Sequence, residues 1–245
     1  MLSRVLLFSG GADSFITWRL LGMPQCLYVA IDHAYQSQEL ATIRALDDAC
    51  TQKDYCLSYA VQDRLTLNDL EQEDGHIPLR NLYLALIASE YGQEILFGAM
   101  AGERSTDKSA RFYRDTSRML THLRGQPYTV VAPFRHLTKT QLVSHFLSTY
   151  PDDVDLLLLT RSCYAPSALP CGRCMACFRR WVSFSLNGIH ETFALPPWEW
   201  DGIRTLPHLL PWITSFFTAS PTEWKGILAH NADATHALLL KHLRR

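Results

Sequence analysis

The stretch LLFSGGADS occupies residues 6–14, close to the start of the chain. Its apolar run predicts a buried strand, and the glycine pair that follows predicts a sharp turn into a helix. Unhindered backbone amides at such a turn, aided by the helix dipole, form a site for phosphate. A Walker loop is excluded because no Lys follows, and the dinucleotide fingerprint is excluded because its third glycine is missing. The alternative is a plain Gly-Gly turn with Ser or Asp as the helix cap.

Apolar runs alternate with helical patterns through the first 150 residues. Strands are expected at residues 5–8, 26–31, 55–61, 95–97 and 128–132, and helices at 14–22, 36–52, 81–91, 114–124 and 137–150. This alternation predicts an α/β fold with a doubly wound, mainly parallel five-stranded sheet. Ligands bind such sheets at the carboxyl ends of the strands. Residues 9–14, Asp32 and 98–103 should therefore meet at one edge, beneath a charged loop at 103–113.

Four of the seven cysteines crowd together near the carboxyl end of the chain, with spacings of seven, two and two residues: Cys163, Cys171, Cys174 and Cys177. Four thiolates are the ligand set of a closed, structural Zn²⁺ site. Disulfides are disfavoured in a reducing compartment. An iron–sulfur cluster remains an alternative, because the same spacing suits it. We expect zinc, in a small helical region.

The composition is that of a globular protein, with 47% hydrophobic and 19% charged residues. A net charge of −1 supplies no global basic field, which counts against a nucleic-acid-binding surface. No apolar stretch approaches the roughly 20 residues of a membrane span, and the first residues lack the pattern of a signal peptide. We therefore expect a cytoplasmic protein that makes no membrane contact.

Taken whole, Ser-Gly-Gly-x-Asp-Ser after an apolar strand resembles the PP-loop of the ATP-pyrophosphatases, which have the adenine nucleotide alpha hydrolase-like fold. With the cysteine cluster, it resembles the 7-cyano-7-deazaguanine synthases, the QueC family of queuosine biosynthesis. Further motifs support this likeness: IPLRNLYLALIAS (77–89), YRD (113–115), PFRHLTKTQLV (133–143) and SCYAPSALPCGRCMACFRR (162–180). The motifs and the change in composition along the chain divide it into a PP-loop domain (1–150), a zinc-binding region (151–188) and a Pro/Trp-rich appendage (189–245).

The resemblance implies an ATP-dependent carbon–nitrogen ligase, active as a homodimer on small molecules. ATP would adenylate 7-carboxy-7-deazaguanine, ammonia would displace AMP to give an amide, and a second adenylation would leave the nitrile. Pyrophosphate is the other product, and the cofactors implied are Mg²⁺ and Zn²⁺. A dry site is required, because water would hydrolyse the adenylate.

The resemblance also implies roles for individual residues. The nucleotide would be bound by Ser9, Gly10, Gly11, Ala12, Asp13, Ser14 and Asp32. Asp13 would orient Mg²⁺ and, with Ser14, Arg114 and Lys139, act in catalysis. The acid would be bound by Arg80, Asn81, Glu103 and Asp107. The simpler alternatives are surface cations for Arg114 and Lys139, a helix cap for Asn81, and a charged loop for Glu103 and Asp107.

Two segments depart from the family pattern on the acceptor side. Residues 32–39 read DHAYQSQE where the family has Asp-Tyr-Gly-Gln, and residues 98–115 lack its Gly-Tyr-Pro-Asp-Cys. No likeness extends beyond Arg180. One alternative is therefore a QueC-like enzyme that passes the acyl group to a protein or nucleic-acid amine, in antiphage defence or DNA modification. A PP-loop tRNA thiolase or amidase, and a non-catalytic nucleotide- and zinc-binding module, are the others.

Overall fold

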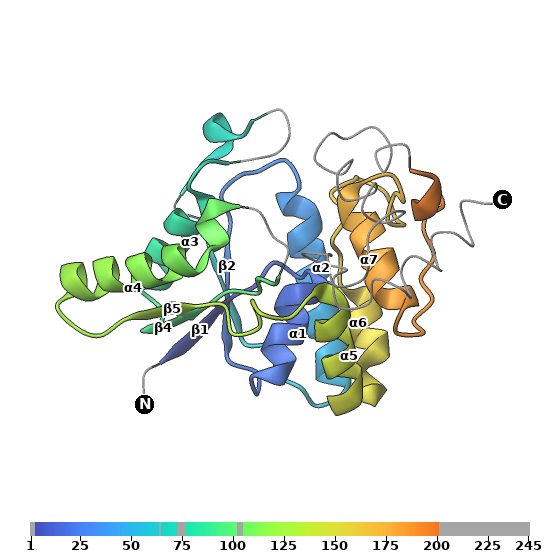
Figure 1. The fold of residues 1–245 in the computed structure, drawn as a ribbon, viewed down its shortest axis with the longest axis horizontal. Helices are drawn as coiled ribbons and strands as arrows, with labels where there is room; N and C mark the ends of the chain where they lie inside the picture. Colours follow the sequence, from blue (N-terminus) through green and yellow to red (C-terminus); the bar gives the residue numbers. More distant parts are fainter. Residues whose placement is uncertain (1–2, 64, 73–76, 102–104, 201–245) are drawn as a thin grey trace, which may run out of the picture. The chain divides into compact units, whose positions relative to one another are not determined.

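The computed structural model describes residues 3–63, 65–72, 77–101 and 105–200 (Figure 1). Five strands form its sheet: β1 (Arg4–Leu7), β2 (Gln25–Val29), β3 (Tyr59–Gln62), β4 (Glu94–Leu96) and β5 (Thr129–Val131). They lie in the order β3-β2-β1-β4-β5, and every neighbouring pair is parallel. The prediction of a doubly wound parallel sheet is confirmed. The strand order reverses at β1, so a crevice for ligands is expected at its carboxyl end.

Helices cover both faces of this sheet. The helices are α1 (Ala12–Leu20), α2 (Gln36–Gln52), α3 (Arg80–Ala88) and α4 (Ala110–Arg124). Figure 1 shows α3 and α4 on one face and α1 and α2 on the other. A parallel sheet buried on both faces needs apolar residues at successive strand positions, and Val5 and Leu6 are both fully buried. This explains why the strands read as continuous apolar runs.

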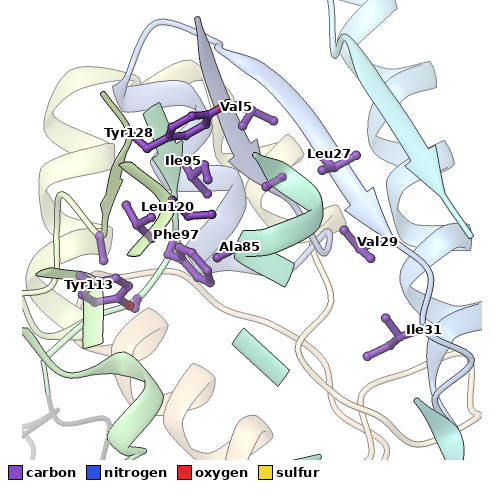
Figure 2. Packing of buried hydrophobic residues seen from close by; sticks show 14 of the residues in the cluster. Val5, Leu27, Val29, Ile31, Ala85, Ile95, Phe97, Tyr113, Leu120 and Tyr128 are labelled. Carbon is purple, nitrogen blue, oxygen red and sulfur yellow. The ribbon is translucent and has the colours of Figure 1, made fainter. Parts of the chain in front are cut away.

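The core beneath α3 and α4 holds alternate strand residues. Figure 2 shows this cluster, in which strand side chains meet those of the two helices: Val5, Leu27, Val29, Ile95, Phe97, Ala85, Tyr113 and Leu120. Phe97 lies 5.6 Å from Tyr113 between ring centroids. The packing fixes α3 and α4 with their amino ends toward the carboxyl edge of the sheet, where the predicted site lies.

The described residues fall into two compact units. Residues 3–63, 65–72, 77–99, 105–135 and 155–160 form the first, with the sheet, α1 to α4 and most of α6 (Val154–Leu159). Residues 100–101, 136–154 and 161–200 form the second, in which α5 (Lys139–Thr149) packs against α7 (Met175–Ser185). The four 3₁₀ turns are η1 (Asn68–Leu70), η2 (Thr106–Lys108), η3 (Pro151–Asp153) and η4 (Pro197–Glu199). The domain boundaries at 150 and 188 stay predictions.

The predicted starts of two elements were wrong by four residues (55 against 59, and 114 against 110). The third strand begins at Tyr59 and not at Tyr55. Helix α4 begins at Ala110 and not at Arg114, because the side chain of Ser109 caps it by accepting a hydrogen bond from the Phe112 amide, at 3.1 Å. Residues 201–245, most of the predicted appendage, lie outside the described residues. None of the described helices combines the length and the apolar character that crossing a membrane requires.

Candidate active site and cysteine site

The PP-loop stretch lies at the carboxyl end of β1, as predicted. Gly10 has a φ of +72°, a left-handed conformation that favours glycine. Gly11 is the N-cap of α1, and it has no side chain with which to cap the helix. The first amides of a helix have no partner within the helix, and with the helix dipole behind them they can bind an anion. Ser14, which is buried, donates its hydroxyl to the carbonyl of Gly11 at 2.9 Å.

Gly98 holds the start of α1 against the end of β4. A Cβ atom added to Gly98 would lie 3.0 Å from both the Cα and the N of Ser14, and 3.1 Å from the carbonyl carbon of Asp13. Only a residue without a side chain permits this approach. The contact brings the segment after β4 beside the PP-loop, as expected from the sheet order. Sequence reasoning placed this segment correctly but missed the role of Gly98, because the contact joins residues far apart in the chain.

A buried polar cluster lies after β2, in the segment that departs from the family pattern. Glu39 Oε2 accepts the hydroxyl of Tyr28 at 3.0 Å and Nε2 of His33 at 3.2 Å. Burial, and then the charge of Glu39, raise the pKa of Tyr28 well above its ordinary value, so the phenol remains a donor. Asp32, predicted to bind the nucleotide, is exposed, with a φ of +62° and its amide donating to Gln36 Oε1 at 2.7 Å.

Two of the predicted acid-binding residues stand at the amino end of α3. The guanidinium of Arg80 donates from Nη1 to the hydroxyl of Tyr35 at 2.8 Å. Asn81 is buried, and its side chain donates to the carbonyl oxygen of Asp107 at 3.3 Å. The carboxylate of Asp107 in turn accepts hydrogen bonds from the backbone N–H of Asn81, at 3.4 Å, and from the hydroxyl of Ser105. Asn81 and Asp107 thus bind each other and fix the segment before α4 to the start of α3.

Of the remaining predicted residues, the structure describes Arg114 on α4 and Lys139 on α5. The Arg114 side chain is 56% exposed on α4 and donates to Asp115 at 3.3 Å. Lys139 belongs to the second compact unit, where it is buried at the first position of α5. Its helix is capped by Thr138 and Gln141, each of which bonds to the backbone of the other. Glu103 lies outside the described residues. The catalytic roles of Arg114 and Lys139 stay predictions.

The four predicted cysteine ligands lie together in the second unit. All four sulfurs are within 4.8 Å of one another, and the Sγ atoms of Cys171 and Cys177 are 3.9 Å apart. A tetrahedral ion with bonds of about 2.3 Å needs sulfurs about 3.8 Å apart. A [4Fe–4S] cluster attaches each sulfur to a different iron and so holds the sulfurs farther apart. The donor set therefore fits a single metal ion.

Backbone amides donate hydrogen bonds to these sulfurs. The Cys163 sulfur accepts the amides of Ala165 and Cys171, each at 3.4 Å, and the Cys174 sulfur accepts the Cys177 amide at 3.4 Å. Hydrogen bonds from the Cys174 and Cys177 thiols, and then these amides, lower the pKa of Cys163 far below that of a free thiol. A thiolate is the form that binds metal.

One arginine shapes the loop between the first two cysteines. The guanidinium of Arg161 donates to four carbonyl oxygens, at 2.6–3.4 Å: those of Cys163, Ala165, Ser167 and Ala168. Sequence reasoning missed Arg161, because nothing in the spacing of the cysteines indicates which cation satisfies the loop carbonyls. Its position two residues before the first ligand was the available signal.

The segment after α7 closes over the second part of the loop. Gly172 has a φ of +71°, and a Cβ atom there would lie 1.7 Å from the carbonyl oxygen of Leu195. The buried guanidinium of Arg180 pairs with the Glu191 carboxylate at 2.7 Å and lies over the Phe184 ring at 4.3 Å. The cysteine loop and residues 191–195 are thus one packed structure.

Comparison with known proteins decides the family. The family model described as the queuosine biosynthesis protein QueC matches residues 58–188, more than half of the chain. The chain belongs to the QueC family. The match includes the start of α3, the Lys139 helix and all four cysteines, so the QueC resemblance of these motifs is confirmed.

Two QueC relatives extend the likeness to most of the chain. A 7-cyano-7-deazaguanine synthase from Marinobacter nauticus is 23% identical over 217 residues, and one from Magnetococcus marinus is 29% identical over 222 residues. Each match covers 78% of this chain and 96% of the relative. Both relatives are synthases, which supports an enzyme of the QueC family.

One solved structure resembles the chain only weakly. It is the U34-tRNA thiolase NcsA from Methanococcus maripaludis with its [4Fe-4S] cluster, at 13% identity and a TM-score of 0.39, covering 98% of this chain and 73% of that one. A likeness of this size carries no argument about the metal of the QueC-family chain.

Proposed function

We propose that this chain adenylates 7-carboxy-7-deazaguanine with ATP and converts it with ammonia to 7-cyano-7-deazaguanine, releasing AMP and pyrophosphate. The observation that carries the proposal is the amino end of α1, which follows Gly10 and Gly11 without a capping side chain at its N-cap, in a chain of the QueC family. An anion site at the end of β1, where the strand order reverses, suits a nucleotide whose pyrophosphate must leave.

In this proposal, the PP-loop amides and the Ser9 and Ser14 hydroxyls hold the pyrophosphate of ATP. A carboxylate oxygen of the acid attacks the α-phosphorus, and the bond to pyrophosphate breaks while the amides neutralise the leaving charge. Ammonia then attacks the acyl carbon, and AMP leaves with the carboxylate oxygen. The amide oxygen then attacks the α-phosphorus of a second ATP and displaces a second pyrophosphate, and loss of AMP and of the two protons on nitrogen gives the nitrile.

Two metals belong to the proposal. Asp13, half-buried in the first turn of α1, is the proposed ligand of a Mg²⁺ ion, which supplies charge neutralisation at the phosphates. Zn²⁺ is proposed for the four cysteines, where it has a structural role and contributes folding energy. The sulfur spacing supports a single tetrahedral ion.

The test is incubation of the chain with ATP, Mg²⁺, ammonium and the acid, with AMP, pyrophosphate and the deazapurine product followed by mass. Formation of the nitrile, dependent on all four, is the expected result. AMP without nitrile would refute ammonia as the acceptor. Absence of acid-dependent AMP would refute adenylation itself.

A matched pair of variants tests the PP-loop. Ser14→Ala removes a buried hydroxyl that bonds to the carbonyl three residues earlier, and it should abolish turnover. Ser183 in α7 is also buried and makes the same type of bond, to Arg180 at 3.0 Å, so Ser183→Ala is the control and should keep full turnover. Equal activity of the two variants would contradict the assignment.

The wider features remain part of the proposal. We propose a PP-loop domain over residues 1–150, a zinc-binding region over 151–188 and an appendage over 189–245, in a cytoplasmic homodimer. Light scattering of the full chain tests the dimer.

A further inference from the structure

The four cysteines of the metal site differ in how the chain holds them. Cys174 is the N-cap of α7, and its sulfur accepts the backbone N–H of Cys177, in the first turn of that helix, at 3.4 Å. The Cys171 sulfur accepts the backbone N–H of Arg173 at 3.3 Å. These three ligands therefore lie on one turn and on the helix start that follows it. Cys163 is the exception, because residues 164–170, which separate it from Cys171, lie in neither a helix nor a strand.

Arg161 binds the backbone of the loop that begins at Cys163, and it does so through all three nitrogens of its guanidinium. Nε donates to the carbonyl oxygen of Cys163 at 3.1 Å, and Nη2 donates to those of Ala165 and Ser167 at 2.7 and 2.6 Å. Nη1 donates to the carbonyl oxygen of Ala168 at 3.4 Å. Carbonyl oxygens that converge on one point repel one another unless a cation lies between them. The guanidinium therefore keeps the loop closed.

The residues that Arg161 binds also hold the sulfur of Cys163. Ala165 is bound at both of its backbone groups, because its carbonyl oxygen accepts Nη2 of Arg161 while its N–H donates to the Cys163 sulfur at 3.4 Å. The N–H of Cys171, at the far end of the loop, donates to the same sulfur at 3.4 Å. Both donors keep their places only while the loop keeps its shape. Arg161 thus acts on the sulfur through the backbone of Cys163 and of Ala165.

A second arginine beside the site allows position to be separated from charge. Arg173 directly precedes Cys174 and is exposed. The bond that it makes to the Cys171 sulfur comes from its backbone N–H, which a substitution of the side chain leaves in place. Arg161 and Arg173 each bring one positive charge close to a cysteine ligand, but the guanidinium of Arg161 binds the loop carbonyls. A comparison of the two residues therefore isolates the effect of those hydrogen bonds.

We propose that Arg161 is a positioning residue for the cysteine site, which fixes residues 163–168 so that the Cys163 sulfur stays within reach of an ion held by the other three cysteines. The inference rests on the zinc site of the proposed function and deepens it, because it names the residue that adds the fourth ligand to the other three. Groups that orient metal ligands change the affinity for the metal by about 10- to 100-fold. Arg161 accordingly sets how tightly the chain retains Zn²⁺.

The test measures the zinc affinity of the full chain by competition with a chromophoric chelator, together with the rate at which excess chelator removes the ion. Arg161→Gln should weaken zinc binding about tenfold or more and speed the release of the ion. Arg161→Lys should do nearly the same, because an ammonium keeps the charge but cannot span four carbonyl oxygens. Arg173→Gln is the matched control, and it should change the affinity by less than about twofold, since an exposed charge is screened by solvent. Circular dichroism of the zinc-loaded variants excludes unfolding as the cause.

A double-mutant cycle identifies the ligand on which Arg161 acts. In a Cys163→Ala background, Arg161→Gln should change the zinc affinity by less than about twofold, because the sulfur that it positions is gone. A tenfold effect that persists in this background, wild-type affinity in Arg161→Lys, or equal losses in Arg161→Gln and Arg173→Gln would overturn the positioning role alone. A wild-type chain that binds no zinc refutes the zinc site of the proposed function, and the role of Arg161 with it.

Discussion

Replacing Gly98 by Ala should separate the stability of the sheet from the geometry of the PP-loop. The new Cβ would lie 3.0–3.1 Å from backbone atoms of Ser14 and Asp13, where ordinary contacts are 3.4–4 Å. Backbone cannot rotate away, so the start of α1 must shift by a few tenths of an ångström. Overpacking of this kind costs about 1–3 kcal/mol of unfolding free energy. A displacement of about 1 Å in a catalytic element lowers the reaction rate about 100-fold. For this smaller shift we expect roughly a tenfold loss in kcat/KM for ATP.

Gly92 provides the matched control for this experiment. It precedes β4, whereas Gly98 follows it, and an added Cβ there would lie 2.8 Å from the carbonyl oxygen of Ser3. Gly92→Ala should therefore lose as much stability as Gly98→Ala in urea unfolding, yet keep wild-type kcat/KM per folded molecule. Acid-dependent pyrophosphate release over a range of ATP concentrations is the assay. Normal kcat/KM in Gly98→Ala, or an equal loss in both variants, would refute the reasoning.

Three further variants probe the cysteine unit. Cys174→Ser should lower bound metal, measured by plasma mass spectrometry, and lower the melting temperature, because a structural ion contributes folding energy; unchanged metal content would show that Cys174 is no ligand. Gly172→Ala should have the same effect, since its Cβ would overlap the carbonyl oxygen of Leu195, and a normal melting curve would contradict that contact. Glu191→Gln should cost about 3–5 kcal/mol in urea unfolding, because the buried Arg180 loses its counter-charge; a loss below about 1 kcal/mol would argue against the pair.

The sheet and the gathering of the four cysteines could be predicted from the sequence, since both signals are local. An apolar run of a few residues is enough to indicate a buried strand. Four cysteines within fifteen residues lie close together in space because the chain between them is short. The start of α4 was misplaced because its polar first turn resembles a charged loop, and the Ser109 cap gives only a weak signal.

The contacts that shape the candidate site could not be predicted in this way. The hydrogen bond between Tyr35 and Arg80 depends on the rotamers of both side chains and on how the elements that carry them pack. Neither leaves a periodic pattern in the sequence. The same holds for Gly98. It must be glycine because the backbone of Asp13 and Ser14, in the first turn of α1, lies against it. Asn81 and Asp107 have polar side chains of the kind that bind substrates, and in the structure they form hydrogen bonds to each other.

The guanidinium of Arg161 has a consequence for how the cysteine site discriminates among ions. It satisfies four carbonyl groups of the loop between Cys163 and Cys171 with a charge supplied by the chain itself. The loop therefore has its curvature before an ion arrives, and the spacing of the sulfurs has little room to widen. A metal site whose sulfurs are held in this way selects an ion by its radius as well as by its affinity for thiolates. It favours small thiophilic ions over larger ones that need longer metal–sulfur bonds.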